Sequence, residues 1–182
     1  MTTSSFEALA DAVVAASDAD RWDQAVLEWQ VVSVARDPHA DGVCVCGQTR
    51  LVSLFTIENT RNGEMLFPIG SSCVNQFGRA DLDRQVDLWE RLLALRQAID
   101  ARQPIRLTTE YFSRAMLDHL YESGAFPPDE WNGGDGWKDY DFLLKMFNKR
   151  DKAAITDGQQ RKIYMLLTRK VIPFVRSYDQ LG

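Results

Sequence analysis

The chain has 182 residues, of which 45% are hydrophobic and 26% are charged, and its formal net charge is -5. These values are typical of a soluble globular chain of one domain, or one domain with an appendage, and they exclude a mainly disordered, collagen-like or supercharged protein. No apolar run approaches the roughly 18 residues that cross a bilayer, and the first 20 residues are acidic where a secretory signal is basic. We therefore expect a cytoplasmic protein with no membrane partner.

The first 70 residues predict one helix followed by three strands. Apolar residues recur at helical spacing over Phe6–Ala16. Strands are predicted by the β-branched and aromatic residues of Glu28–Val34, Leu51–Ile57 and Glu64–Ile69. Asn62-Gly63 separates the last two strands and predicts a hairpin with a type I′ turn, in which both residues have positive φ.

The remainder of the chain is predicted to be helical. The expected helices begin near Cys73, run from Asp81 to Ile99, from Thr108 to Ser123 and from Tyr140 to Asn148, and extend from a Thr156 cap to a stop before Pro173. Together these elements predict an α+β fold in which a small antiparallel sheet is flanked by an N-terminal helix and a helical C-terminal half. We expect one domain over residues 1–78 and a helical region over residues 79–182.

The three cysteines are the most informative residues in the sequence. Cys44-Val45-Cys46-Gly47 places two sulfurs on one side of an extended chain, and the glycine allows a tight turn beneath a bound ion. Cys73 follows the predicted hairpin, in the first turn of a predicted helix, where a thiolate is favoured. An odd, sparse set makes a poor disulfide framework, so metal binding is the preferred interpretation, against the alternative of three small buried hydrophobic residues.

The fourth ligand of such an ion is an open question in the sequence. A structural zinc site is nearly always four-coordinate. His39, five residues before Cys44, is our candidate and would complete a Cys3His site with one structural zinc ion per chain. Asp41 and His119 are alternatives, and a catalytic zinc with an open position would need a nearby base such as Glu58 or Glu64.

The segment Cys44–Gly47, called the knuckle below, is followed by the predicted hairpin and then by the start of a helix. This order resembles the treble-clef zinc fold. More specifically, four segments resemble a pattern found in small uncharacterised phage and bacterial proteins with a zinc-ribbon or treble-clef-like module. These segments are Cys44-Val45-Cys46-Gly47, Asn59-Thr60-Arg61-Asn62-Gly63, Ile69-Gly70-Ser71-Ser72-Cys73 and Phe77. The resemblance covers about a quarter of the chain and implies a zinc module on a phage or mobile-element protein.

The charge distribution is asymmetric along the chain. Residues 1–100 carry 8 Lys and Arg against 15 Asp and Glu, whereas residues 101–182 carry 13 against 11. A basic cluster in the last third is a candidate for phosphate contacts, the alternative being a solvated helix face. The candidate nucleic-acid-binding residues are Lys149, Arg150, Lys152, Arg161, Lys162 and Lys170.

These observations predict a non-enzymatic, zinc-stabilised protein that binds nucleic acid or a nucleoprotein complex. The alternative is a protein–protein inhibitor of a host defence complex, and a zinc hydrolase is the less favoured third hypothesis. Two further features are predicted to be structural. The segment Asn132–Gly136 is expected to be a flexible loop, with Trp131 and Trp137 as its anchors or, as the less favoured alternative, as a contact surface. His119 is expected to be a structural or surface histidine.

Overall fold

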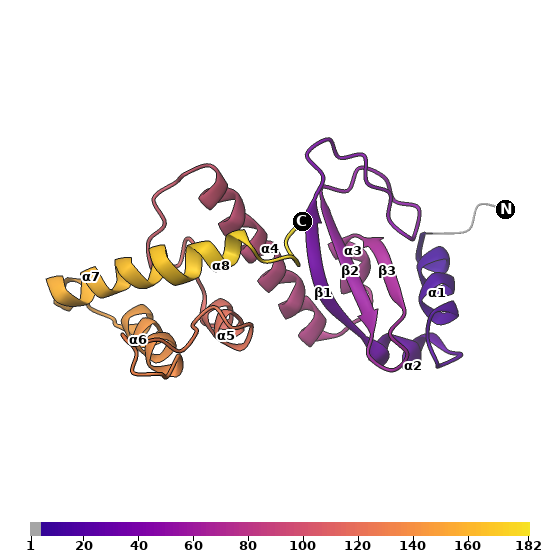
Figure 1. The fold of residues 1–182 in the computed structure, drawn as a ribbon. Coiled ribbons are helices and arrows are strands. Elements are labelled where there is room, and N and C mark those ends of the chain that lie inside the picture. The colour runs from indigo at the N-terminus through magenta and orange to yellow at the C-terminus, as the bar shows by residue number, and fades with distance from the viewer. Residues whose placement is uncertain (1–4) are drawn as a thin grey trace. The chain divides into compact units, whose positions relative to one another are not determined.

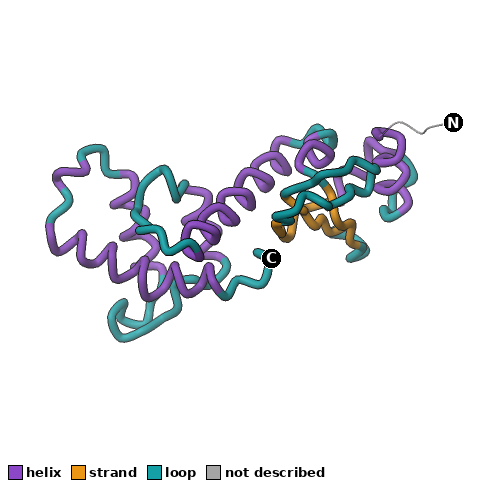
Figure 2. Tube along the Cα trace, turned by 90° about the horizontal axis from the view of Figure 1, so that it is seen from above, coloured by secondary structure: helices purple, strands orange, loops and turns teal. Residues whose placement is uncertain are grey.

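The protein is described by a computed structural model of residues 5–182, which has an α+β architecture (Figure 1). The chain divides into two compact units, one that ends at Leu93 and also includes Asp179–Gly182, and one that comprises Ala94–Tyr178. All strands belong to the first unit, whereas the second consists of helices and loops (Figure 2). In the described part of the chain, no helix is long and apolar enough to cross a membrane.

The division falls inside helix α4 (Ala80–Asp100), not after residue 78 as the sequence suggested. The first half of α4 belongs to the first unit because it is tied to strand β1. The Val31 amide donates to Gln85 Oε1 at 2.8 Å, and Trp89 Nε1 donates to the Val31 carbonyl at 3.2 Å. Leu82 is fully buried on the same helix.

The predicted three-stranded antiparallel sheet is confirmed. Its strands β1 (Trp29–Arg36), β2 (Ser53–Asn59) and β3 (Met65–Ile69) pair in the order β1-β2-β3. The hairpin between β2 and β3 is present, but the type I′ turn is wrong, because only Gly63 of its turn residues has positive φ. The Gly63 amide instead donates to the Asn59 carbonyl at 2.9 Å, which closes a longer loop.

Short helices complete the first unit. They are α1 (Ser5–Ala15), α2 (Trp22–Ala25), the 3-10 turn η1 (Val26–Glu28) and α3 (Ser71–Asn75). The sequence predicted α1 and α3 but not α2 or η1. Glu28 was expected in the first strand and instead lies in η1, where it is buried. Its carboxylate accepts hydrogen bonds from Asn59 Nδ2 at 2.7 Å and from two backbone amides, so this polar group fixes the start of the sheet.

The second unit contains α5 (Arg114–Glu122), α6 (Trp137–Asn148), the 3-10 turn η2 (Lys152–Ala154) and α7 (Asp157–Leu166). The predicted helix from Thr108 is too long, because α5 is capped at Ser113, whose hydroxyl accepts the Met116 amide at 3.2 Å. The predicted Thr156 cap of α7 is confirmed as a capping box with Gln159.

The predicted stop before Pro173 is wrong. After α7 the chain continues through the π-helical turn η3 (Leu167–Val171) into α8 (Ile172–Arg176), with the proline in the first turn of α8. A proline inside a regular helix clashes with the carbonyl four residues earlier, whereas the first turn of a helix tolerates it. The wider π-helical turn η3 ends at Val171, two residues before the proline. It separates α7 from α8, and the chain remains helical throughout.

Candidate metal centre

The loop between β1 and β2 carries the first two cysteines in a tight turn. The Cys44 amide donates to the Gln48 carbonyl at 2.8 Å, and the Gly47 amide donates to the Cys44 carbonyl at 2.7 Å. Gly47 has a φ of 86°, a left-handed conformation that favours glycine. The Val45 amide donates to the Pro68 carbonyl at 3.0 Å, so the turn is attached to the outer edge of β3.

The third cysteine comes from α3, on the far side of the hairpin. Ile69 ends β3, and Gly70 precedes the helix that places Cys73 in its first turn. The Gly70 amide points at the knuckle and donates to Cys44 Sγ at 3.4 Å. A direct backbone contact therefore fixes the start of α3 next to the knuckle.

These segments bring the three cysteines together as the sequence predicted. Their sulfurs lie within 4.8 Å of one another, with Cys73 Sγ 3.2 Å from Cys46 Sγ and 3.6 Å from Cys44 Sγ. The residues are buried and form no disulfide. Zn–S bonds of about 2.3 Å in a tetrahedral site place sulfurs about 3.8 Å apart, so a small outward movement would admit the ion.

The cluster is polarised even without an ion. Burial alone would raise the pKa of Cys46, but the Gln48 amide and the hydrogen bonds with Cys73 and Cys44 lower it below the usual thiol value. Burial raises the pKa of Cys73, and its two sulfur neighbours raise it further because adjacent thiolates repel. The lowered pKa of Cys46 favours its thiolate, which is the form that binds metal.

The proposed fourth ligand is not part of the cluster. His39 is exposed in the turn that follows β1, where its backbone amide donates to Asp37 Oδ1 at 2.9 Å. The Asp41 amide donates to the other oxygen of Asp37. The Asp37 carboxylate therefore holds the backbone of both candidate ligands from this loop, His39 and Asp41. His119 lies in α5 of the second unit, and its Nε2 is 2.9 Å from the Tyr178 hydroxyl. Among residues 5–182 the cluster contains three ligand atoms, all of them sulfur.

The carboxylates considered for a catalytic zinc are likewise outside the cluster. Glu58 lies on β2 and accepts a hydrogen bond from Gln30 Nε2 at 3.3 Å. Glu64 is exposed in the loop before β3. Within the described chain, no carboxylate or imidazole joins the three sulfurs.

The candidate nucleic-acid-binding residues differ in their contacts: the lysines have partners within the protein, and the two arginines are exposed. Lys149 and Lys152 donate to carbonyls at the end of α6 and in η2, at 2.6 to 2.9 Å. Lys162 lies 3.7 Å from Asp139 and 4.6 Å from the centre of the Phe142 ring. The two arginines of the predicted set, Arg150 and Arg161, are exposed.

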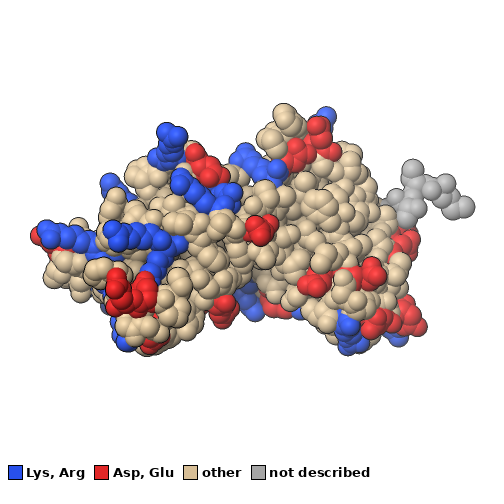
Figure 3. Space-filling view, viewed as in Figure 1, with Lys and Arg blue, Asp and Glu red and all other residues tan. Residues whose placement is uncertain are grey.

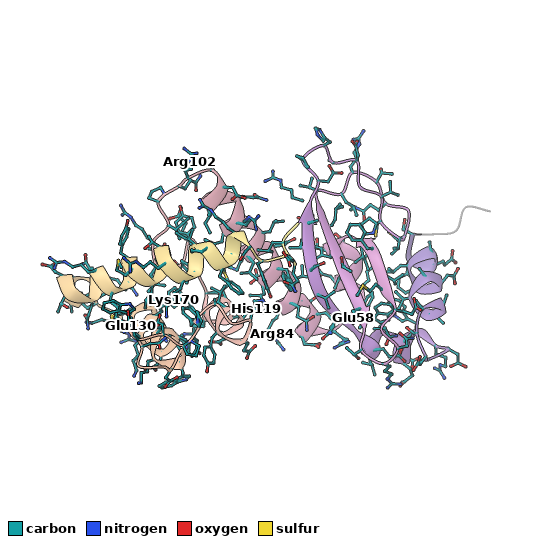
Figure 4. All side chains as sticks on the ribbon, in the orientation of Figure 1. Glu58, Arg84, Arg102, His119, Glu130 and Lys170 are labelled. Atoms are coloured by element: carbon teal, nitrogen blue, oxygen red, sulfur yellow. The ribbon has the colours of Figure 1, made fainter. Side chains whose placement is uncertain are left out.

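Lys170 is the most tightly held of the predicted basic residues. Its ammonium lies 2.6 Å from carboxylate oxygens of both Asp129 and Asp139, and Asp139 is buried. Figure 4 shows Lys170 beside the loop that carries Glu130, and the two residues line the same hollow. The structure thus assigns Lys170 to an internal ion network, which the sequence analysis did not detect because its partners lie more than 30 positions away.

The loop around Asn132 is ordered by its own side chains. Asn132 is buried, accepts the amides of Asp129 and Asp135, and donates to Asp139 Oδ2 at 3.0 Å. The expectation of a loop anchored by tryptophans is wrong, because Trp131 is 80% exposed and Trp137 is 49% exposed. The Asn and Asp residues of this segment could have predicted its order, since the side chains of both types accept hydrogen bonds from nearby backbone amides and so form turns.

The surface charge follows the two units. The first unit has 7 Lys and Arg against 15 Asp and Glu, and the second has 14 against 11. In Figure 3 acidic side chains predominate on the visible face of the first unit, and Lys and Arg side chains gather over the second.

Comparisons with protein-family models, with curated proteins and with solved structures found no match for this chain.

Proposed function

We propose that the first unit binds one zinc ion through Cys44, Cys46 and Cys73, and that the ion has a structural role. The observation that carries the proposal is the convergence of three buried thiols from a turn and a helix separated by a hairpin. A buried set of sulfur ligands suits zinc, which prefers cysteine thiolates in structural sites.

The arrangement favours a treble-clef-like module, which the sequence pattern also suggested through its resemblance to small phage and bacterial proteins. The knuckle, the β2–β3 hairpin and the first turn of α3 follow one another in the order of that fold. We assign the fourth position to His39, because it lies on the same loop as the knuckle, five residues from Cys44. A rearrangement of the exposed 37–42 turn would be required to bring its imidazole to the ion.

The decisive experiment is elemental analysis of the purified full-length chain. We expect about one zinc per chain, loss of the ion in Cys73→Ser, and weakened retention under a chelator in His39→Ala. Ser72→Ala is the matched control, since Ser72 is the exposed neighbour of Cys73 on α3. A wild-type chain that contains no metal after purification and takes up none on dialysis against zinc would refute the proposal.

Nucleic-acid binding is the second candidate function, and the exposed guanidinium groups of Arg150 and Arg161 are the observation in its favour. They lie in a segment, Lys145–Arg176, with nine basic and two acidic residues. A binding site that uses them would lose affinity as salt rises, because phosphate contacts release counterions.

The test is a salt titration with a single-stranded and a double-stranded oligonucleotide. Arg150→Glu together with Arg161→Glu is expected to reduce both the affinity and the salt slope, whereas Arg21→Glu, an exposed arginine of the first unit, is the control. Binding that ignores charge reversal would reject this function. A partner that is retained from host lysate after nuclease treatment and identified as a protein would favour an inhibitor of a host complex.

A further inference from the structure

The second unit contains an open groove that the zinc proposal does not use. Its volume is about 840 Å³, and its walls come from the segment after α4, the end of α6, η2 and the α7–η3 helix. Every lining residue lies between Ile105 and Leu167, so the groove belongs to this unit alone. Its apolar residues are Ile105, Leu107, Phe147, Ile155, Ile163 and Leu167.

The apolar walls are incompletely covered. Leu167 is buried, but Ile105, Leu107, Ile155 and Ile163 are only partly buried although they face a common hollow. Tyr164 on the rim is 65% exposed. Contiguous apolar surface left open in this way marks binding sites, and the volume lies in the range of small-molecule pockets.

The charged residues of the groove all have one sign. Arg106, Arg114 and Lys152 line it, and no Asp or Glu does. This distinguishes the groove from the neighbouring hollow, in which Asp129 and Asp139 face Lys170. Among the residues that line the groove, an anionic ligand group would therefore find positively charged partners and no carboxylate.

Two of these cations are held in place by the fold. Arg114 Nε donates to Asn148 Oδ1 at 2.6 Å, which fixes the guanidinium and leaves its terminal nitrogens to donate elsewhere. Lys152 Nζ donates to the Met146 and Phe147 carbonyls at 2.9 and 2.6 Å, at the end of α6. Because these positions are already ordered, a bound anion would not have to restrain them, which favours affinity.

We infer that this groove binds a small amphiphilic anion, with an alkyl or aryl body against the aliphatic walls and a carboxylate-like head on Arg106, Arg114 and Lys152. The lining is mainly aliphatic, with Phe147 and Tyr164 as its aromatic members, and this argues for such a ligand over a nucleic acid, because a nucleic-acid backbone gains nothing from isoleucine and leucine walls. The inference goes beyond the proposed zinc function and does not depend on it, since the groove and the cysteines belong to different units.

The test is titration of the zinc-supplemented full chain with octanoate, followed through isoleucine methyl resonances. Ile105, Ile155 and Ile163 line the groove, whereas Ile57 and Ile69 lie in the sheet of the first unit and act as internal controls. Octanol, which has the same number of carbon atoms and no charge, is the matched probe. We expect saturable shifts of the three groove methyls with octanoate, no shifts of the sheet methyls, and binding of octanol at least tenfold weaker.

The variants separate the charge from the apolar wall. Arg106→Gln combined with Arg114→Gln should weaken octanoate at least tenfold and leave octanol unchanged, as expected for charge-assisted hydrogen bonds. Arg102→Gln removes an exposed arginine of the same unit that does not line the groove, and it should change the affinity for neither probe. Three results would each overturn the inference. The first is equal binding of octanoate and octanol, and the second is methyl shifts spread over both units. The third is displacement of octanoate by an oligonucleotide at a concentration below that of octanoate.

Discussion

Removal of zinc from the first unit should lower its stability, and Cys73→Ser should abolish that dependence. Cys73 is central to the cluster, since its sulfur contacts both other sulfurs at 3.2 and 3.6 Å. A serine hydroxyl is a poor zinc ligand, so this change removes a ligand while it keeps a side chain of similar size in α3. Ion binding and folding of such a module are coupled.

The expected magnitude follows from mass action. With free zinc about 100-fold above the dissociation constant, binding adds about 2.7 kcal/mol to the free energy of unfolding. The first unit has about 100 residues, for which 1 kcal/mol shifts the melting temperature by about 4–8 °C. Chelation should therefore lower the melting temperature of this unit by about 10–20 °C, and the variant should melt at the same temperature with and without zinc.

The assay combines thermal unfolding of the full chain with hydrogen exchange of the β2 and β3 amides, so that the two units are observed separately. Ser72→Ala should keep the full response to zinc. The reasoning is refuted if chelation changes neither the melting temperature nor the exchange while Cys73→Ser destabilises the chain equally in both conditions. That result would identify the cysteines as ordinary core residues.

Three further changes test polar groups that the structure revealed or confirmed. Burial raises the pKa of Glu28, but its hydrogen bonds, led by that from Asn59, lower it below 4.5 in total. The stability that Glu28 contributes is therefore present above pH 4.5 and is lost as the pH falls through the folded pKa. Glu28→Gln should flatten the acid limb of a stability–pH profile. Lys170→Met leaves the buried Asp139 without its closest cation and should cost about 3 kcal/mol in urea unfolding, and a loss under about 0.5 kcal/mol would contradict the network. Thr156→Ala removes the capping box of α7 and should cost about 1 kcal/mol in the same assay, while an unchanged midpoint would contradict it.

The elements that the sequence predicted well are those whose pattern is local. The strands follow runs of β-branched and aromatic residues, and α7 begins at a cap that Thr156 and Gln159 form within one turn. One error arises where a distant contact decides. Glu28 leaves the predicted strand because Asn59, 31 positions away, and two nearby amides surround its carboxylate.

The metal centre shows the same distinction. The C-x-C-G spacing and the position of Cys73 in the first turn of a helix were enough to predict the three sulfurs, because a short turn and a hairpin determine where they meet. The position of His39 could not be predicted, since it depends on a loop whose conformation is set by the Asp37 carboxylate and the amides that it accepts. Likewise, the charge of Lys170 was visible in the sequence, but its engagement with Asp129 and Asp139 was not.

The connection between β1 and β2 gives a physical reason for an ion at this place. Residues 37–52 contain no helix or strand. The bridge between Gly42 and Leu51 lies within this connection, and the Val45–Pro68 hydrogen bond joins it to β3. Connections of this length without secondary structure are uncommon in compact domains and are usually functional. An ion bound to Cys44, Cys46 and Cys73 would tie the middle of this connection to α3, and would supply the restraint that backbone pairing does not provide.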